Sequence, residues 1–161
     1  MRIAGITYPD VANGIGFRVT LWVQGCSHRC PGCHNSGTWD FNGGKEFDEE
    51  EKKKLFDVLS KPYIKGLTLS GGDPLFSYSD IIVLLKEVRE KFPDKDVWLW
   101  SGFTLDSIRG RFPAVLTLVD YIVDGKFDET KKDLTLAFRG SSNQTIWEKN
   151  ENGEFVRSEL N

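Results

Sequence analysis

The chain has 161 residues, of which 39% are hydrophobic and 28% charged, and it contains 11 Phe, 5 Trp and 4 Tyr. This composition excludes a disordered chain and predicts one domain, residues 1–161, with a single hydrophobic core. The 21 Lys and Arg against 24 Asp and Glu give a net charge of −3, which argues against a general DNA- or RNA-binding protein.

No apolar run approaches the roughly 20 residues that span a bilayer, and residues 1–5 lack the apolar stretch of a signal peptide, so we expect a cytoplasmic protein without a membrane partner.

The three cysteines of the chain point to a metal site. Cys26, Cys30 and Cys33 lie close together and are odd in number, so they cannot form a closed disulfide set. Three neighbouring thiols in a reducing compartment predict metal binding.

The first predicted elements are a strand and a helix on either side of the cysteine loop. Residues 17–24 alternate apolar and polar side chains, as expected of a β-strand. The apolar set is Phe17, Val19, Leu21 and Val23. Asp48 followed by Glu51 resembles the capping box that begins a helix, and apolar residues then recur at helical spacing as far as Leu59. We expect this helix to end near residues 61–62.

Further strands and helices follow in alternation. A short strand at Gly66–Ser70 ends in the turn Gly71-Gly72-Asp73-Pro74, and apolar residues from Ile81 to Phe92 then recur at helical spacing. The later predicted elements are a strand at Val97–Trp100 with the turn Ser101-Gly102, a short helix around Leu105–Arg111, a strand at Tyr121–Val123, and a terminal β-hairpin formed by Gln144–Glu148 and Glu154–Val156.

This alternation predicts an α/β fold with a largely parallel sheet and helices packed outside it. A complete eight-unit (β/α) barrel usually needs about 250 residues. The chain offers only four or five units. We therefore expect an open, partial (β/α) barrel followed by a C-terminal β-hairpin.

The cysteine loop can hold either of two metal centres. A 4Fe–4S cluster is normally bound by four thiolates, so three cysteines would leave one iron open to a small molecule. Structural zinc needs four N or S ligands, and His28 or His34 could complete a Cys3His set. Spacing alone leaves both centres possible.

The cysteine loop and the glycine turn together resemble the signature of the radical S-adenosylmethionine enzymes. That signature is Cys-x3-Cys-x2-Cys after the first barrel strand and a Gly-Gly-Asp/Glu-Pro turn after the next, and both are present in this order. The resemblance implies that Cys26, Cys30 and Cys33 hold a 4Fe–4S cluster whose open iron binds S-adenosylmethionine. It also implies that Gly71, Gly72 and Asp73 shape the methionine pocket, and that Gly32, Cys33 and His34 lie against the nucleoside. Many members carry an aromatic residue at the position of Gly32, so any adenine contact here would use the backbone.

Three further segments resemble a short branch of this superfamily, the glycyl-radical activating enzymes. The segments are Asn13–Arg18, Cys33-His34-Asn35 with Trp39 and Phe41, and Arg139–Gln144; Val123–Phe127 also fits. Taken singly, each could be an ordinary hairpin turn, a pair of core aromatics or a polar loop. Taken together, they resemble the activating proteins of anaerobic ribonucleoside-triphosphate reductases.

The resemblance implies reductive cleavage of S-adenosylmethionine to a 5′-deoxyadenosyl radical, which removes hydrogen from a backbone glycine of a partner and generates a glycyl radical. The implied partners are the large catalytic subunit of the reductase and a flavodoxin- or ferredoxin-like electron donor. No catalytic side chain is expected, because the cofactors perform the chemistry. The alternatives are an activase of another glycyl-radical enzyme of the formate-lyase type, a non-catalytic Cys3His zinc-binding adaptor, and a simple electron-transfer protein.

Overall fold

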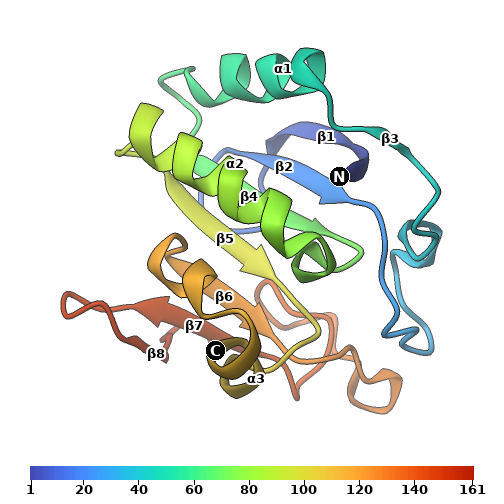
Figure 1. The fold of residues 1–161 in the computed structure, drawn as a ribbon. Coiled ribbons are helices and arrows are strands. Elements are labelled where there is room, and N and C mark those ends of the chain that lie inside the picture. Colours follow the sequence, from blue (N-terminus) through green and yellow to red (C-terminus); the bar gives the residue numbers. More distant parts are fainter.

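The computed structural model describes residues 1–161 as a mixed α/β fold built on one eight-stranded sheet (Figure 1). The strand order across the sheet is β3-β1-β2-β4-β5-β6-β7-β8. The strands are β1 (Arg2–Asp10), β2 (Arg18–Val23), β3 (Lys45–Glu46), β4 (Gly66–Gly71), β5 (Asp96–Trp100), β6 (Tyr121–Asp124), β7 (Thr145–Lys149) and β8 (Phe155–Arg157).

The centre of the sheet is parallel and its two sides are antiparallel. Strands β2, β4, β5 and β6 pair in parallel, whereas β1, β3, β7 and β8 join through antiparallel pairs. Strand β2 is buried on both faces, since Thr20 is as inaccessible as Val19 and Leu21. Phe17 was expected among the apolar strand residues, but it precedes β2 and is 53% exposed, so that assignment is wrong.

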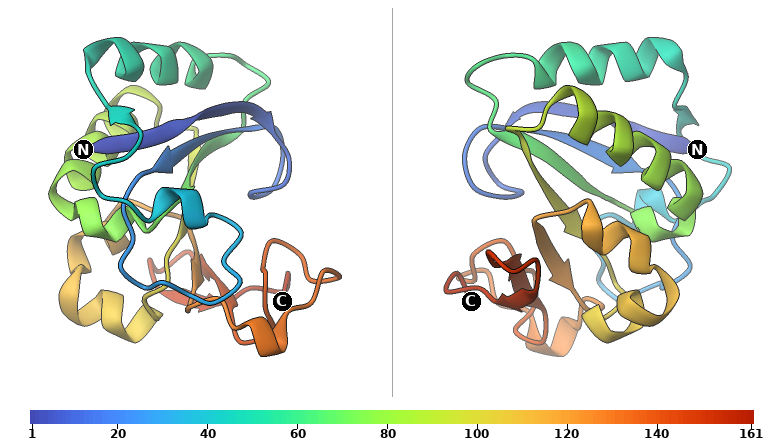
Figure 2. Two further views of the ribbon diagram at one scale, coloured as in Figure 1. Left: turned by 90° about the vertical axis from the view of Figure 1, so that its right-hand side faces the viewer. Right: turned by 60° about the vertical axis from the view of Figure 1, so that its left-hand side comes forward.

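Three helices follow one another along one face of the sheet (Figure 2). They are α1 (Glu49–Leu59), α2 (Tyr78–Lys91) and α3 (Leu105–Arg111). The predicted start of α1 is confirmed, because the Asp48 carboxylate accepts a hydrogen bond from the Glu51 N–H at 2.9 Å. The reciprocal half of the capping box is absent, since Glu51 instead forms ion pairs with Lys45 and Lys54.

Each face of the sheet has its own apolar cluster. The larger cluster joins the sheet to the helices, with residues such as Leu69 and Leu99 packed among Ile81 and Leu85. The smaller cluster is centred on Trp98, whose ring stacks on Tyr121 at 4.3 Å. No residue of the three α-helices belongs to this second cluster.

The ends of the sheet remain open. The predicted terminal hairpin is confirmed, because β7 and β8 pair antiparallel, whereas β1 and β3 were not predicted from the sequence. β3 and β8 are the two edges of the sheet and do not pair with each other. None of the helices has the length and apolar character needed to span a membrane.

Candidate iron-sulfur and ligand site

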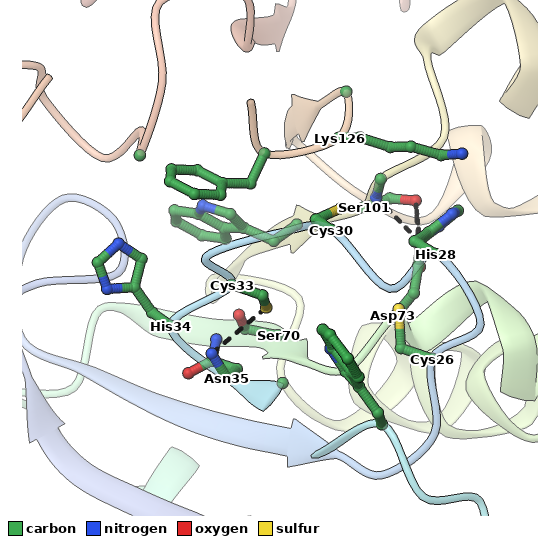
Figure 3. A pocket seen from close by; sticks show the side chains of 18 of the residues that line it. Cys26, His28, Cys30, Cys33, His34, Asn35, Ser70, Asp73, Ser101 and Lys126 are labelled. Carbon is green, nitrogen blue, oxygen red and sulfur yellow. Dashed lines mark hydrogen bonds and ion pairs between the residues drawn. The ribbon is translucent and has the colours of Figure 1, made fainter. Parts of the chain in front are cut away.

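A pocket lies at the carboxyl ends of the four parallel strands, where α/β folds build their sites (Figure 3). Each strand contributes the segment that follows it. These segments are the cysteine loop after β2, Ser70–Asp73 at the end of β4, Trp100–Gly102 at the end of β5 and Gly125–Phe127 after β6. The parallel register therefore brings together residues that are a hundred positions apart in the sequence.

All three cysteines line this pocket as free thiols (Figure 3). The base of their loop is closed by two backbone hydrogen bonds, from the Gly25 N–H to the Thr38 carbonyl at 2.7 Å and from the Cys26 N–H to the Trp39 carbonyl at 3.2 Å. Residues 25–26 and 38–39 therefore lie side by side at the base of the loop, and the three thiols lie in the pocket at the carboxyl ends of the parallel strands.

Backbone N–H groups lie near all three sulfur atoms. The Asn35 N–H donates to Cys33 Sγ at 3.4 Å, and the N–H groups of His28 and Phe127 contact the thiols of Cys26 and Cys30. Burial nevertheless raises the pKa of both Cys26 and Cys30, which disfavours their thiolate forms, and a bound metal centre would offset that cost. Backbone N–H groups that contact sulfur are the donors that tune iron–sulfur clusters.

The arrangement of the donors fits a cluster better than a single metal ion. Tetrahedral zinc with bonds of about 2.3 Å would bring its sulfur ligands within about 4 Å of one another. No group of three or more His, Cys, Asp or Glu side chains in the chain is placed to hold one metal ion. Three thiols spread around a shared pocket, with backbone N–H groups nearby, fit a larger centre such as a 4Fe–4S cluster with one iron lacking a thiolate.

The glycine turn after β4 packs against the stem of the cysteine loop. The Gly72 N–H donates to the Val23 carbonyl at 2.8 Å, and a Cβ on Gly72 would lie 2.5 Å from the Gly25 carbonyl oxygen. Gly71 has a φ of +112° and leaves equally little room for a side chain. Both glycines line the pocket, and no backbone N–H donates to the Gly72 carbonyl, which is free to accept from a ligand.

Asp73 lies at the centre of a hydrogen-bond network and is 1% exposed. Its carboxylate accepts from the Ser101 hydroxyl at 2.9 Å, from the Gly102 N–H at 2.9 Å and from the Leu75 N–H at 3.0 Å, and it contacts His28 Nε2 at 2.7 Å. Asp73 borders the pocket, but its carboxylate already accepts hydrogen bonds from groups of the chain itself.

Of the three residues expected beside the nucleoside, Cys33 and His34 line the pocket and Gly32 does not. His34 lines the pocket, with its ring 5.5 Å from that of Phe127. Gly32 is exposed, with a φ of +75°; a Cβ there would meet the Glu129 side chain at 3.0 Å, and Gly32 is not among the pocket residues.

The segment 139–144, to which the sequence assigned no role, holds the loop after β6 through side-chain hydrogen bonds. The Gln144 amide donates to the Gly125 carbonyl at 3.0 Å, and its oxygen accepts from the Gly140 N–H at 2.9 Å. The Asn143 amide donates to the Lys126 carbonyl at 2.8 Å. Sequence reasoning marked this motif but could not assign its role, because its partners lie 17 to 19 positions earlier in the chain.

Comparison with known proteins agrees with this geometry. The family model of the 4Fe-4S single cluster domain matches residues 12–147. The anaerobic ribonucleoside-triphosphate reductase-activating protein of Escherichia coli (strain K12) is 43% identical over 144 residues, covering 86% of this chain and 94% of the relative. Proteins of the same name from Vibrio cholerae and Enterobacteria phage T4 are each 44% identical, covering 86% and 87% of this chain and 93% and 90% of the respective relative. The chain belongs to the family of anaerobic ribonucleoside-triphosphate reductase-activating proteins.

Proposed function

We propose that this protein activates an anaerobic ribonucleoside-triphosphate reductase by generating a glycyl radical on it. The observation that carries the proposal is the pocket itself, in which three thiols without a fourth lie beside a glycine turn at the carboxyl ends of four parallel strands. The names of the relatives support the choice of reductase over a formate-lyase type of partner.

In this proposal Cys26, Cys30 and Cys33 hold a 4Fe–4S cluster and leave one iron free for S-adenosylmethionine. Gly71, Gly72 and Asp73 form the methionine end of the pocket. The Gly72 carbonyl is the group that we expect to accept from the ligand's amino group, since nothing else in the backbone donates to it.

The nucleoside end of the ligand is assigned to Gly32, Cys33 and His34. His34 is the side chain placed to contact the ligand there, because it lines the pocket against Phe127. Gly32 has no side chain and is exposed, so its contribution would be limited to the backbone of the loop that carries Cys33.

When bound, the reduced cluster and S-adenosylmethionine supply one-electron cleavage of a carbon–sulfur bond and a radical that abstracts hydrogen from a backbone glycine. The residues of the chain position these groups and exclude water. Trp100 and Phe127 form apolar walls of the pocket, and the Trp100 indole is fixed by a hydrogen bond to the Phe138 carbonyl at 3.1 Å. No side chain is assigned to acid, base or nucleophilic catalysis.

The fold supports a macromolecular substrate. We interpret the unclosed sheet as a partial (β/α) barrel of the radical S-adenosylmethionine type, in which β3 and β8 remain unpaired with each other. The open side would admit the glycine-bearing loop of the large reductase subunit. A flavodoxin- or ferredoxin-like protein is the proposed electron donor, and the cytoplasm, which keeps thiols reduced, is the proposed location.

The decisive experiment mixes the reduced, cluster-loaded protein with S-adenosylmethionine and the reductase under anaerobic conditions. We expect a glycine-centred radical signal by electron paramagnetic resonance. Cys30→Ala should abolish both the cluster and the signal. Activation of a formate-lyase type enzyme in place of the reductase would contradict the proposed partner, and one zinc per chain without sulfide would contradict the proposed cluster.

A further inference from the structure

The arc that carries Cys26 and Cys30 has few attachments to the rest of the protein. No backbone N–H or C=O of residues 27–32 forms a hydrogen bond with another segment of the chain. Cys30 contacts the Phe127 N–H through its sulfur, which in the loaded protein would also bind iron. The His28 imidazole is the remaining side chain of this arc that hydrogen-bonds to a distant segment.

The His28 side chain is buried and closely packed on several sides. Its Nε2 lies 2.7 Å from Asp73 Oδ2, and the side chain is 8% exposed. Its ring centroid lies 5.2 Å from that of Phe76 and 4.7 Å from that of Phe103. A Cβ on Gly102 would approach the ring to 2.6 Å, so glycine is required where the ring passes over the turn after β5.

The backbone beside His28 is held in an unfavourable conformation. Arg29 has a φ of 52°, in the left-handed region that residues with a side chain seldom adopt. Such conformations persist where the surrounding structure enforces them. The buried His28 ring lies immediately before this residue, and the Arg29 guanidinium itself lies 5.8 Å from the centre of the Trp39 ring.

The Asp73 carboxylate, which is the partner of His28, is held in place by three further hydrogen bonds. Asp73 is held by the Ser101 hydroxyl and by the N–H groups of Gly102 and Leu75, so its carboxylate cannot follow His28 if the arc moves. Asp73 also follows directly after Gly72, whose free carbonyl borders the pocket. The stem of the cysteine loop is already bound to the glycine turn, since the Asp73 N–H donates to the Gly25 carbonyl at 3.1 Å. The His28–Asp73 contact adds an attachment for the arc beyond Cys26 (Figure 3).

We propose that His28 is a positioning residue, which fixes the Cys26–Cys30 arc to the glycine turn so that cluster and ligand meet at a fixed spacing. This inference rests on the proposed function and extends it to His28, which lines the pocket but is assigned no bond to iron or to the ligand. His28 lies two positions from each of two thiols, so displacement of its ring moves both.

The first test uses the metal-free protein, so its outcome does not depend on cluster chemistry. We expect ¹⁵N relaxation order parameters for residues 27–30 to fall from roughly 0.85 to below about 0.6 in His28→Ala. His28→Gln retains an N–H donor for Asp73 and should recover part of the order. Ser27→Ala is the matched control, because Ser27 is exposed, lies in the same arc and makes no hydrogen bond.

The second test measures the Kd of S-adenosylmethionine for the cluster-loaded proteins by anaerobic equilibrium dialysis. Loss of a group that orients metal ligands typically costs about tenfold or more in affinity. We therefore expect about a tenfold higher Kd in His28→Ala, an intermediate value in His28→Gln and an unchanged value in Ser27→Ala, with iron and sulfide content near wild type in all three.

The outcomes separate the two proposals. If wild-type protein assembles no 4Fe–4S cluster or fails to bind S-adenosylmethionine, the proposed function is overturned whatever the order parameters show. If wild-type protein does both and His28→Ala matches Ser27→Ala in order and in Kd, the positioning role is overturned and the proposed function stands.

Discussion

Buried charged side chains occur at both ends of the parallel strands, and at each end several polar groups hold them. Asp73 lies at the carboxyl ends, beside the pocket. Arg18 lies at the amino ends, fully buried, where it contacts Asp96 at 2.6 Å and donates to Thr68 Oγ1 at 2.8 Å. The separation of these networks along the strands allows substitutions at one end to be tested without altering the other.

Asp96→Ala should destabilise the protein without weakening the ligand site. It leaves the Arg18 guanidinium buried without its counter-ion, which typically costs about 3–5 kcal/mol in the free energy of unfolding. Asp96→Asn retains an acceptor oxygen and should cost less. Urea unfolding of the metal-free proteins measures both values. An unchanged midpoint for Asp96→Ala would show that the ion pair contributes nothing to stability.

Asp10 predicts a specific pH dependence. Burial would raise the pKa of this carboxyl, but hydrogen bonds from Asn13, Thr20 and the backbone hold its pKa below the usual value. Because the folded pKa is lower than that of the unfolded chain, about 3.9, the contribution of Asp10 is complete above about pH 5 and is lost as the pH falls through the unfolded and then the folded value.

Asp10→Asn removes that contribution. We expect it to lower the free energy of unfolding of the metal-free protein by about 1–3 kcal/mol at pH 7, since the Asn13 amide then faces a group that accepts less well. The difference from wild type should shrink below pH 4. Urea titrations between pH 3 and pH 7 provide the measurement, and a difference independent of pH would contradict the assignment to the Asp10 charge.

At the scale of elements, the sequence predicted the strands and helices whose patterns are regular and local. The helix at Leu105–Arg111 has the predicted bounds, and the strand predicted at Val97–Trp100 ends as expected and begins one residue earlier, because period and flanking turn agree there. β1 was missed because Gly5 and Pro9 interrupt its apolar pattern, and its strand character depends on pairing with β2. Such pairing is a tertiary effect that local propensity does not encode.

For the site, too, the local motifs could be predicted from the sequence, whereas the contacts between distant segments could not. The three thiols and the glycine turn form recognisable spacings, and the structure places them in one pocket. The hydrogen bonds of the Asp73 carboxylate to Ser101 and His28 could not be predicted, because these two residues follow other strands of the sheet. The outward position of Gly32 follows from its left-handed backbone, a conformation that the motif spacing does not specify.

The attachment of the segment 139–144 to the loop after β6 gives a prediction at this scale. Gln144→Ala removes three contacts, to the Gly125 carbonyl and to the N–H groups of Gly140 and Ser141. We expect Phe127 to lose its position in the pocket wall and the Kd of S-adenosylmethionine to rise about tenfold. Equilibrium dialysis of the cluster-loaded protein tests this.

Gln144→Glu serves as the matched variant. Its carboxylate still accepts from the Gly140 and Ser141 N–H groups but cannot donate to the Gly125 carbonyl. Its Kd should therefore lie between those of wild type and Gln144→Ala. Equal affinities in all three proteins would show that this segment does not shape the ligand site.

For the whole molecule, the site is the junction of loops from four strands, and ligands that bind several of these loops should stabilise the fold. The cysteine loop, the glycine turn and the turn after β5 meet at Asp73, while the loop after β6 is held separately by Gln144. Local opening of any of these loops would disrupt the pocket. Binding free energy should therefore appear as global stability.

We expect S-adenosylmethionine at about 100 times its Kd to stabilise the cluster-loaded protein by about 2.7 kcal/mol. For a chain of this length, that corresponds to a rise in Tm of about 5–10 °C. Anaerobic scanning calorimetry with and without the ligand measures the shift. The metal-free protein and Cys30→Ala should show a much smaller shift, because the open iron that binds the ligand is then missing. An equal shift in metal-free and loaded protein would place the ligand elsewhere and contradict the proposed site.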